Sequence, residues 1–396
     1  MKICFISNNS IGEGFSGGER IYTELLKGWR RYGYTQLMGS EESIRASQQR
    51  GVAAQFLQTS PANRHPRYGL FGLLLHTVQR LVAGIRSLTR FADELQDVTV
   101  VYSVSDFYPD FIPALLMKRR HPEMIWIAGF YLFAPQPWAK NSSYQGLNRV
   151  RGLIYWLMQV PSYYLINRYA DKVFVTSEPD VKRFVTARRS VKDVIVVQGG
   201  VDITDSEAYL AQAPEAKTQE KRFDACFIGR LHYQKGVLIL LDIWSRVCFL
   251  KPKARLAMIG DGPLEAHVRE KIRLLGLTEN VELLGFLDGP PKHAIFKQSK
   301  IMVHPATYDS GGMAAAEGMA WRLPGVSFDL EALKTYYPQG MVKIPCYDEQ
   351  AFADAICRLL DDPVHYAEEA QKAYELILKV WDWKKRSERV WAQVGL

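Results

Sequence analysis

Residues 223–236 read FDACFIGRLHYQKG, and this stretch decides the fold. It opens with a short, almost wholly apolar run, which is typical of a central strand in a parallel sheet covered by helices on both faces. The run ends at Gly229 and Arg230, and Lys235 stands just before the next expected helix. In open α/β sheets ligands bind beyond the carboxyl ends of the strands, so the two cations flank a candidate anion site.

The same alternation of short apolar runs with helical patterns continues in both directions. Amphipathic segments typical of helices include residues 19–32, 264–275 and 349–360. The predicted strands are Lys2–Ser7, Asp97–Ser103, Met124–Ala128, Lys172–Thr176, Val194–Val197, Phe223–Ile228, Arg255–Ile259, Val281–Leu284, Ile301–His304 and Gly325–Phe328. Together they predict an α/β protein of two consecutive, doubly wound, Rossmann-like domains.

A chain of 396 residues is too long for one ordinary core, which also favours two domains. Residues 199–222 are polar and hold no candidate strand, so the boundary is placed there. We predict a first domain over residues 1–200, a second over 201–380 and a final helix over 381–396. That last segment is aromatic and charged and follows a helix of the second domain.

Composition excludes several classes of protein. Hydrophobic residues make up 47% and charged residues 23% of the chain, which excludes disordered and coiled-coil proteins. The five cysteines are widely spaced, so neither a disulfide scaffold nor a zinc site is expected, and a reducing, cytoplasmic compartment fits best. The start, MKICFISNNS, lacks the features of a secretory signal, and no apolar stretch reaches the ~20 residues that span a bilayer.

Positive charge is concentrated in the first 200 residues, which hold 25 Lys and Arg against 15 Asp and Glu. Residues 64–90 and 131–170 are basic, rich in apolar or aromatic side chains and free of acids. Such helices suit an anionic membrane surface. The alternative is that both pack on the sheet and carry Arg on their outer faces. The arginines of the first segment are Arg64, Arg67, Arg80, Arg86 and Arg90.

The most specific stretch is residues 304–324, HPATYDSGGMAAAEGMAWRLP. An Ala-rich helix begins after two glycines, so the amides near Gly312 and Met313 are placed to bind phosphate oxygens. Glu317 lies on a helix of small apolar side chains, where a carboxylate is costly without a partner, and vicinal ribose hydroxyls would supply one. Asp309 precedes the helix and is placed to reach the hydroxyls of a transferred sugar. The alternative is a capping Asp and an isolated helical Glu.

A second glycine-rich turn, SGGER, occupies residues 16–20. Gly17 and Gly18 allow backbone amides at a helix N-terminus to approach an anion. The chain has no GxGxxG fingerprint at this turn, which argues against a nucleotide-dependent oxidoreductase. It also has no pattern of a known nucleic-acid-binding module.

Several blocks of the sequence resemble the signature blocks of the retaining GT-B glycosyltransferases of family 4. The blocks are GRLHYQKG at 229–236, IGDGPLEAHV at 259–268, NVELLGFL at 280–287 and the stretch at 304–324, with GGER at 17–20 and GGVD at 199–202. The resemblance is dense over residues 223–330 and loose over 1–200. It implies two Rossmann-like domains facing a cleft, with the nucleotide-sugar donor mainly on the second and the acceptor mainly on the first. It also implies a last helix that crosses back to the first domain.

By this resemblance Arg230 and Lys235 hold the donor diphosphate and stabilise its developing charge, and Glu317 holds the ribose. No metal or other cofactor is expected, because the paired cations do the work of Mg²⁺. Asp309 matches the family's first motif glutamate and is one methylene shorter. The candidate acceptor contacts, on the first domain, are Glu19 and Asp106.

The sequence departs from the family at two further places. Arg322 stands where the family usually has Gly, and residues 125–134, IWIAGFYLFA, lack the His that commonly follows the fifth strand of the first domain. We therefore weigh two hypotheses. The first is a glycosyltransferase that retains configuration and acts on a saccharide, glycolipid or polyprenyl-linked acceptor, in the cytoplasm or at the inner face of the membrane. The alternative is a catalytically impaired, glycosyltransferase-like binding protein or partner subunit.

Overall fold

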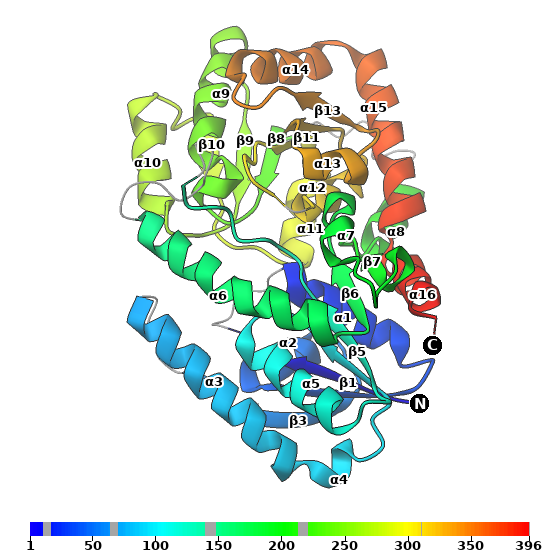
Figure 1. Ribbon diagram of the computed structural model, residues 1–396. Helices are drawn as coiled ribbons and strands as arrows, with labels where there is room; N and C mark the ends of the chain where they lie inside the picture. The colour runs from blue at the N-terminus through cyan, green and yellow to red at the C-terminus, as the bar shows by residue number, and fades with distance from the viewer. Residues whose placement is uncertain (11–16, 64–69, 139–147, 213–220, 310, 396) are drawn as a thin grey trace. The chain divides into compact units, whose positions relative to one another are not determined.

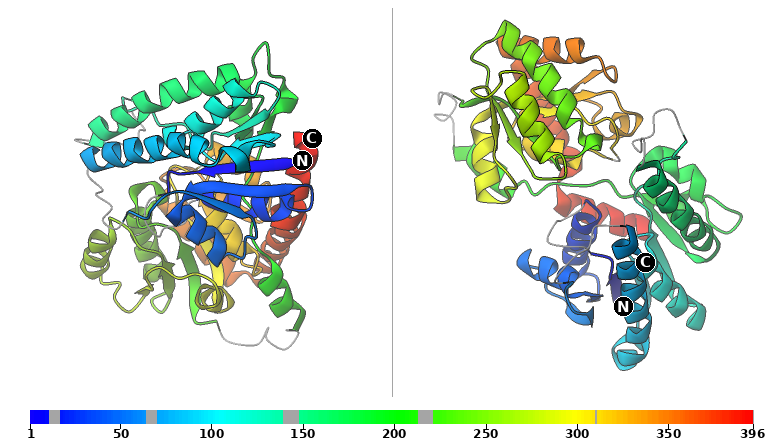
Figure 2. Two further views of the ribbon diagram at one scale, coloured as in Figure 1. Left: turned by 90° about the horizontal axis from the view of Figure 1, so that it is seen from below. Right: turned by 90° about the vertical axis from the view of Figure 1, so that its left-hand side faces the viewer.

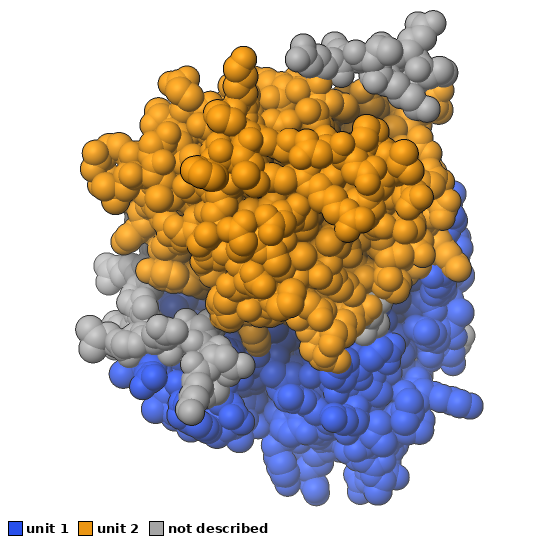
Figure 3. Space-filling view, turned by 90° about the horizontal axis from the view of Figure 1, so that it is seen from above, with its two compact units in different colours: residues 1–199, 384–396 blue, residues 200–383 orange. Residues whose placement is uncertain are grey.

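The computed structural model of the chain describes residues 1–10, 17–63, 70–138, 148–212, 221–309 and 311–395. The chain divides into two compact units (Figure 3): unit 1 comprises residues 1–199 and 384–396, and unit 2 comprises residues 200–383. Each unit is built on its own parallel sheet (Figure 1).

Unit 1 contains a parallel sheet in the order β3-β2-β1-β4-β5-β6-β7. Its strands are β1 (Lys2–Ser7), β2 (Tyr34–Ser40), β3 (Gln55–Ser60), β4 (Val100–Ser103), β5 (Ile125–Gly129), β6 (Lys172–Val175) and β7 (Val194–Val196). Its helices are α1 (Gly17–Trp29), α2 (Glu41–Gln49), α3 (Leu70–Arg90), α4 (Ala92–Leu95), α5 (Tyr108–Arg120), α6 (Asn148–Tyr169), α7 (Glu178–Phe184) and, at the far end of the chain, α16 (Trp383–Val394).

Two helical layers cover the two faces of this sheet. On one face α3, α5 and α6 share a single apolar cluster with the strands, including Leu88 of α3, Phe111 of α5 and Ile166 of α6 (Figure 2). On the other face the fully buried ring of Trp29 in α1 packs on aromatic rings of β1, β4 and β6. Residues that are apolar on both sides of a strand are thus buried on both sides, as a parallel sheet requires.

Helix α16 completes the second layer. Trp391 of α16 lies edge-on to Trp29, with ring centroids 5.2 Å apart, and stacks on Tyr32 at 4.3 Å. Gly28 permits this approach, since a Cβ there would lie 1.7 Å from Oγ of Ser387. The prediction that the last helix crosses back to the first unit is confirmed.

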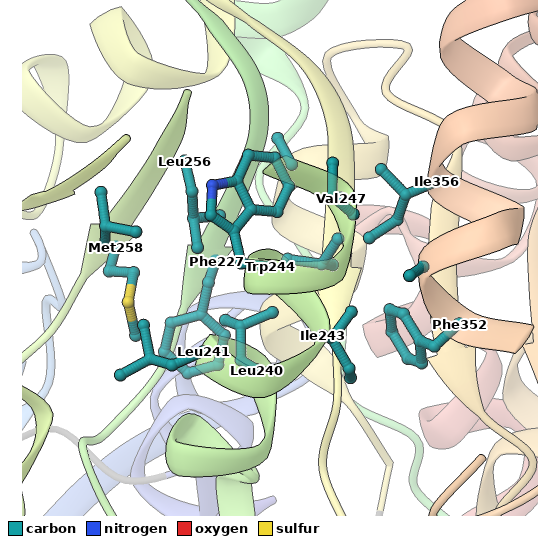
Figure 4. Packing of buried hydrophobic residues seen from close by; sticks show 14 of the residues in the cluster. Phe227, Leu240, Leu241, Ile243, Trp244, Val247, Leu256, Met258, Phe352 and Ile356 are labelled. Atoms are coloured by element: carbon teal, nitrogen blue, oxygen red, sulfur yellow. The ribbon is translucent and has the colours of Figure 1, made fainter. Parts of the chain in front are cut away.

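Unit 2 contains a parallel sheet in the order β10-β9-β8-β11-β12-β13. Its strands are β8 (Phe223–Ile228), β9 (Leu256–Ile259), β10 (Val281–Leu283), β11 (Ser299–His304), β12 (Gly325–Phe328) and β13 (Met341–Ile344). Its helices are α8 (Thr204–Gln212), α9 (Val237–Leu250), α10 (Glu265–Leu274), α11 (Pro290–Lys297), α12 (Met313–Met319), α13 (Glu331–Tyr336), α14 (Glu349–Asp361) and α15 (Pro363–Leu376). In its core Trp244 and Leu240 of α9 pack with Phe227 of β8 and Phe352 of α14 (Figure 4).

The predicted doubly wound α/β class is confirmed, and three strands were missed. Strands β2 and β3 carry polar side chains that the fold buries: Gln36 donates a hydrogen bond from its amide to Gln55 on the next strand and another to the carbonyl oxygen of Glu94. Strand β13 is short and follows an irregular segment. The strand predicted over 97–103 begins only at Val100.

Arg80 corrects the expectation of an exposed arginine row on residues 64–90. Its side chain is only 4% exposed and lies 2.6 Å from a carboxylate oxygen of Glu42 on α2. It also donates a hydrogen bond to the carbonyl oxygen of Pro61. Arg86 and Arg90 are exposed, whereas Arg64 and Arg67 lie outside the described residues. Arg80 is therefore a buried structural cation and not a surface contact.

Candidate active site

The carboxyl edge of the sheet in unit 2 is formed by loops that are tied together by backbone hydrogen bonds. The amide of Thr307, after β11, donates to the carbonyl oxygen of Gln234 at 3.0 Å, and the amide of Leu231 donates to that of Asp261, after β9, at 2.7 Å. Gly236 has a φ of +65°, and a Cβ there would lie 1.9 Å from the carbonyl oxygen of Pro305. The stretches at 229–236 and 304–324 thus meet in one site.

Asp309 joins these two stretches through its carboxylate. Oδ2 lies 2.6 Å from Nζ of Lys235 and 3.1 Å from Nε2 of His304. Oδ1 accepts hydrogen bonds from the amides of Gly311 at 3.2 Å and Gly312 at 3.0 Å. A carboxylate offers about four acceptor positions, so these four partners occupy its capacity.

The charge of Asp309 is stabilised despite its burial. Burial by itself would raise the pKa of this carboxyl, but the positive charge of Lys235 and the contact with His304 outweigh it and hold the pKa well below the ordinary value. The prediction that Asp309 contacts a transferred sugar stays a prediction. In this geometry its oxygens are directed to Lys235, His304 and the loop amides.

Arg230 and Lys235 give the site its positive field. Arg230 is exposed, and no ion pair joins it to another residue of the described ranges. The half-buried His232 lies between them: burial lowers the pKa of its imidazole, and the charges of Arg230 and Lys235 lower it further. These influences favour the neutral form of His232, and the side chain of Arg230 beside it is exposed.

Glu317 has a protein partner that the sequence did not reveal. A carboxylate oxygen of Glu317 lies 2.7 Å from Nζ of Lys292, whose side chain is 6% exposed. Lys292, on α11, also pairs with Asp288 at 2.8 Å. The only sequence signal was a lysine in the otherwise neutral start of that helix, PPKHAIF. Lys292 satisfies part of the charge of Glu317 that ribose hydroxyls were expected to satisfy.

Helix α12 begins at Met313, after Gly312 in a left-handed conformation. Oη of Tyr337 donates a hydrogen bond to the carbonyl oxygen of Gly312 and fixes the turn. The helix has seven residues, so its dipole is small, and an anion at this edge would depend mainly on the two cations. The neighbouring Ser310 lies outside the described residues.

The candidate residues of unit 1 form a separate group. Gly17 and Gly18 are the first residues of α1, and a carboxylate oxygen of Glu19 accepts a 2.6 Å hydrogen bond from Ser10, after β1. The buried carboxylate of Asp106, after β4, accepts from Nε2 of Gln159 on α6 at 2.8 Å. Burial raises the pKa of Asp106 to about 6. Ser16, the first residue of the SGGER turn, lies outside the described residues.

Sequence reasoning missed Asp110 at the start of α5. Its Oδ1 accepts hydrogen bonds from the amides of Asn8 at 2.6 Å and Asn9 at 3.2 Å, in the loop after β1. Burial raises the pKa of this carboxyl to about 7, although those amides and Ser105 favour the charged form. Asp110 thus anchors the first loop of unit 1. The signal in the sequence was an acid one turn into a helix that follows a strand.

Arg322 has a structural explanation away from the site. Its φ is +62°, in the left-handed region that favours glycine. The guanidinium donates a 2.6 Å hydrogen bond to Gln371 and lies over the ring of Tyr374 on α15. The residue therefore marks a tight turn after α12, so its departure from the family pattern does not bear on the site.

Comparison with known proteins identifies unit 2. The model of the family "Glycosyl transferases group 1" matches residues 222–362. Those residues are similar to that family. The matched segment contains Arg230, Lys235, Lys292, Asp309 and Glu317.

Relatives and solved structures extend the likeness. The chain is 31% identical to the amylovoran biosynthesis glycosyltransferase AmsD of Erwinia amylovora over 40% of this chain and 44% of that protein. It is 22% identical to the phosphatidylinositol N-acetylglucosaminyltransferase gpi3 subunit of Schizosaccharomyces pombe over 46% of this chain and 41% of that protein. The alignments thus span less than half the length of these relatives.

Several solved structures cover the whole chain, and two of them show the likeness. Anabaena HepE, in complex with UDP and glucose, superposes with a TM-score of 0.69 at 15% identity and covers 100% of this chain and 99% of its own. The sucrose-phosphate synthase of Thermosynechococcus elongatus gives 0.71 at 18% identity, with the same coverage. At this identity the likeness establishes the fold, and the GT-B fold is confirmed.

The described residues were also compared with the requirements of a metal site and of a membrane-spanning helix. Among the described residues no group of three or more His, Cys, Asp or Glu side chains lies together as metal ligands would. No helix within the described ranges is both long and apolar enough to cross a bilayer.

Proposed function

We propose that the chain is a glycosyltransferase that moves a sugar from a nucleoside-diphosphate-sugar donor to an acceptor hydroxyl with retention of configuration. The observation that carries the proposal is that Lys235 and the exposed Arg230 lie at the carboxyl edge of the sheet, within the segment that matches the group 1 glycosyltransferases. A similar fold, that of HepE, is described with UDP and glucose bound.

The proposed roles follow from charge and position. The bond between the anomeric carbon and the diphosphate oxygen breaks, and negative charge builds on that oxygen. Arg230 and Lys235 stabilise the charge without a metal, in the way of any fixed cation near a developing oxyanion. The acceptor oxygen bonds to the anomeric carbon on the same face, and the departing phosphate takes the acceptor's proton. This route needs no side-chain base, which fits a first unit without a histidine after β5.

Nucleotide recognition is assigned to Glu317, whose carboxylate lies 2.7 Å from Nζ of Lys292. The amide of Met313 is assigned to the diphosphate as a hydrogen-bond donor, whereas the amide of Gly312 donates to Asp309. The acceptor is proposed to be a saccharide or lipid-linked saccharide, bound mainly by unit 1 with Glu19 and Asp106 among its contacts. Gly17 and Gly18 are assigned to the donor side. The five cysteines are free thiols, in line with a cytoplasmic location.

A thermal-shift screen against UDP-, GDP- and ADP-sugars tests the donor assignment. The preferred donor should raise the melting temperature, because binding stabilises the native state by mass action. The same protein is then incubated with that donor and assayed for release of nucleoside diphosphate. Binding with slow hydrolysis or transfer supports the enzyme, and binding with no turnover on any acceptor supports the impaired binding protein. No shift with any nucleotide sugar contradicts both.

A further inference from the structure

Helix α3 exposes an apolar stripe on the side that faces away from its sheet. Its buried side chains, such as Leu88, point into the core, whereas the opposite face carries exposed aliphatic residues at helical spacing. These are Leu74, Leu75, Val78, Val82 and Ile85, with exposed fractions between 37% and 55%. A face that packed on the unit's own sheet would be buried, so this stripe is not used up in the core.

Helix α6 carries a second stripe of the same kind. Its exposed residues at intervals of three and four are Val150, Leu153, Leu157, Val160 and Tyr164, with exposed fractions between 39% and 62%. Ile166 on the opposite side of the helix is fully buried in the cluster that also holds Leu88 of α3. Helices α3, α5 and α6 lie on one face of the sheet (Figure 2) and bury their inner sides in one cluster. The stripes of α3 and α6 are therefore on the outer side of this layer.

Charge on this layer has one sign. Exposed cations flank the stripes: Arg86 and Arg90 on α3, and Arg149 and Arg168 on α6. Helices α3 and α6 contain no Asp or Glu, and the acid of the intervening α5, Asp110, is buried. Trp138, whose ring centroid lies 5.1 Å from that of Trp156 on α6, is 58% exposed. Exposed aliphatics, a tryptophan and unopposed arginines are the composition of a surface that enters the headgroup region of an anionic bilayer.

We propose that the outer surface of α3 and α6 docks unit 1 on an anionic lipid bilayer. The aliphatic stripes enter the interface, and the arginines contact lipid phosphates. A second copy of this chain is the poorer occupant, because two such faces would bring arginines together without a carboxylate to pair them. The docking stands beside the proposed function and does not require turnover.

Co-sedimentation with vesicles tests the proposal. Vesicles of phosphatidylcholine with about one-third phosphatidylglycerol should bind the protein at low salt, and binding should weaken steeply as salt rises. Arg86→Gln with Arg90→Gln should weaken binding about thirtyfold, since each arginine near the surface contributes about fivefold. Val78→Ser with Leu157→Ser should weaken it at least about tenfold, because two exposed apolar contacts are lost.

A matched control uses exposed apolar residues of unit 2. Phe249 and Leu274 are 87% and 68% exposed, and Phe249→Ser with Leu274→Ser should leave vesicle binding unchanged. The proposal is overturned if the protein does not bind anionic vesicles at low salt. It is also overturned if the control variant weakens binding as much as Val78→Ser with Leu157→Ser does. A third contrary result is that Val78→Ser with Leu157→Ser converts a dimer in solution to a monomer. If the protein shows a thermal shift with a nucleotide sugar but does not bind vesicles, the docking proposal is contradicted and the proposed function is unaffected.

Discussion

The carboxyl edges of the two parallel sheets have opposite chemistry. At the edge in unit 2, Arg230 and Lys235 set a positive field, and Asp309 is paired with a cation. At the edge in unit 1, the carboxyls of Asp106 and Asp110 are buried among neutral donors. The pKa of Asp309 is therefore held low, while the pKa values of Asp106 and Asp110 rise to about 6 and about 7.

The same parallel α/β fold can thus hold a carboxylate at its carboxyl edge in two states. The state depends on whether the partners of the carboxylate are cations or neutral hydrogen-bond donors. A carboxylate beside a fixed cation stays ionised and orients that cation. A buried carboxylate held by amides and hydroxyls sits close to its neutral form near pH 7. The first arrangement suits an anionic ligand, and the second suits a ligand whose hydroxyls can donate and accept.

Removal of the cations in unit 2 should have the largest effect. Arg230→Ala and Lys235→Ala should each lower kcat at least about a hundredfold, because each removes stabilisation of the developing diphosphate. Arg230 is exposed, so Arg230→Ala should leave stability unchanged, whereas Lys235→Ala removes the cation beside the buried Asp309, leaves it with His304 and should also lower the melting temperature. As controls, Arg246→Ala and Lys251→Ala remove surface ion pairs of the same unit and should change kcat by about twofold or less. Near-normal kcat in a folded Arg230→Ala, Lys235→Ala double variant contradicts the site.

The two carboxylates of unit 2 should separate nucleotide binding from transfer. Glu317→Gln should weaken binding of the bare nucleoside diphosphate by roughly 1–3 kcal/mol, because a charge-assisted hydrogen bond is lost. Asp309→Asn should leave that affinity intact and lower transfer, because Asp309 is predicted to contact the transferred sugar, which the bare nucleoside diphosphate lacks.

Titration calorimetry and initial rates measure these two effects. Glu331→Gln, which loses an exposed pair with Lys334, serves as the control and should leave both unchanged. If Asp309→Asn instead abolishes nucleotide binding while Glu317→Gln spares it, the two assignments are reversed.

The smallest expected effect concerns pH and Asp110. Between pH ~4 and pH ~7 the unfolded chain has lost this proton and the native state still holds it, so stability falls as pH rises through that window. The loss is at most about 4 kcal/mol. Asp110→Asn can accept from the same two amides and should reduce the fall in melting temperature between pH 5 and pH 8.

Asp309→Asn provides the contrast in calorimetric scans. The native pKa of Asp309 is depressed, so its stabilising contribution is present above the unfolded pKa near 3.8 and is lost only at lower pH. Its replacement should lower the melting temperature equally at pH 5 and pH 8. A wild-type profile that is flat from pH 5 to pH 8, or unchanged by Asp110→Asn, contradicts the difference between the edges.

Sequence reasoning succeeded where local pattern decides structure. Strand β8 was predicted at its observed bounds, Phe223–Ile228, because its apolar run is bounded by polar residues and Gly229. Strand β2 was missed because the buried amide of Gln36 finds its partner in Gln55 on β3, which no local pattern records. The GT-B fold was predicted from the motif blocks of unit 2, together with the last helix.

The contacts that the sequence did not predict are ion pairs between residues far apart in the chain. Lys292 and Glu317 lie on different helices, and nothing in either segment indicates that they meet. Arg80 was predicted to be a surface cation because its own segment has no acid. In the fold its side chain is buried and pairs with Glu42 on α2. An ion pair that only the folded chain brings together leaves no pattern in either sequence segment. Glu317 and Arg80 were therefore interpreted without knowledge of their partners.

Helix α16 has a consequence for synthesis of the chain. Unit 1 cannot cover Trp29 until α16 has been made, and all of unit 2 is translated in between. At common rates of translation the ribosome needs roughly 10–40 s for that interval, during which an apolar face of the first unit waits for its last element. Fluorescence of Trp29 in chains stalled before and after α16 would follow the closure. The first segment made is thus among the last to finish folding.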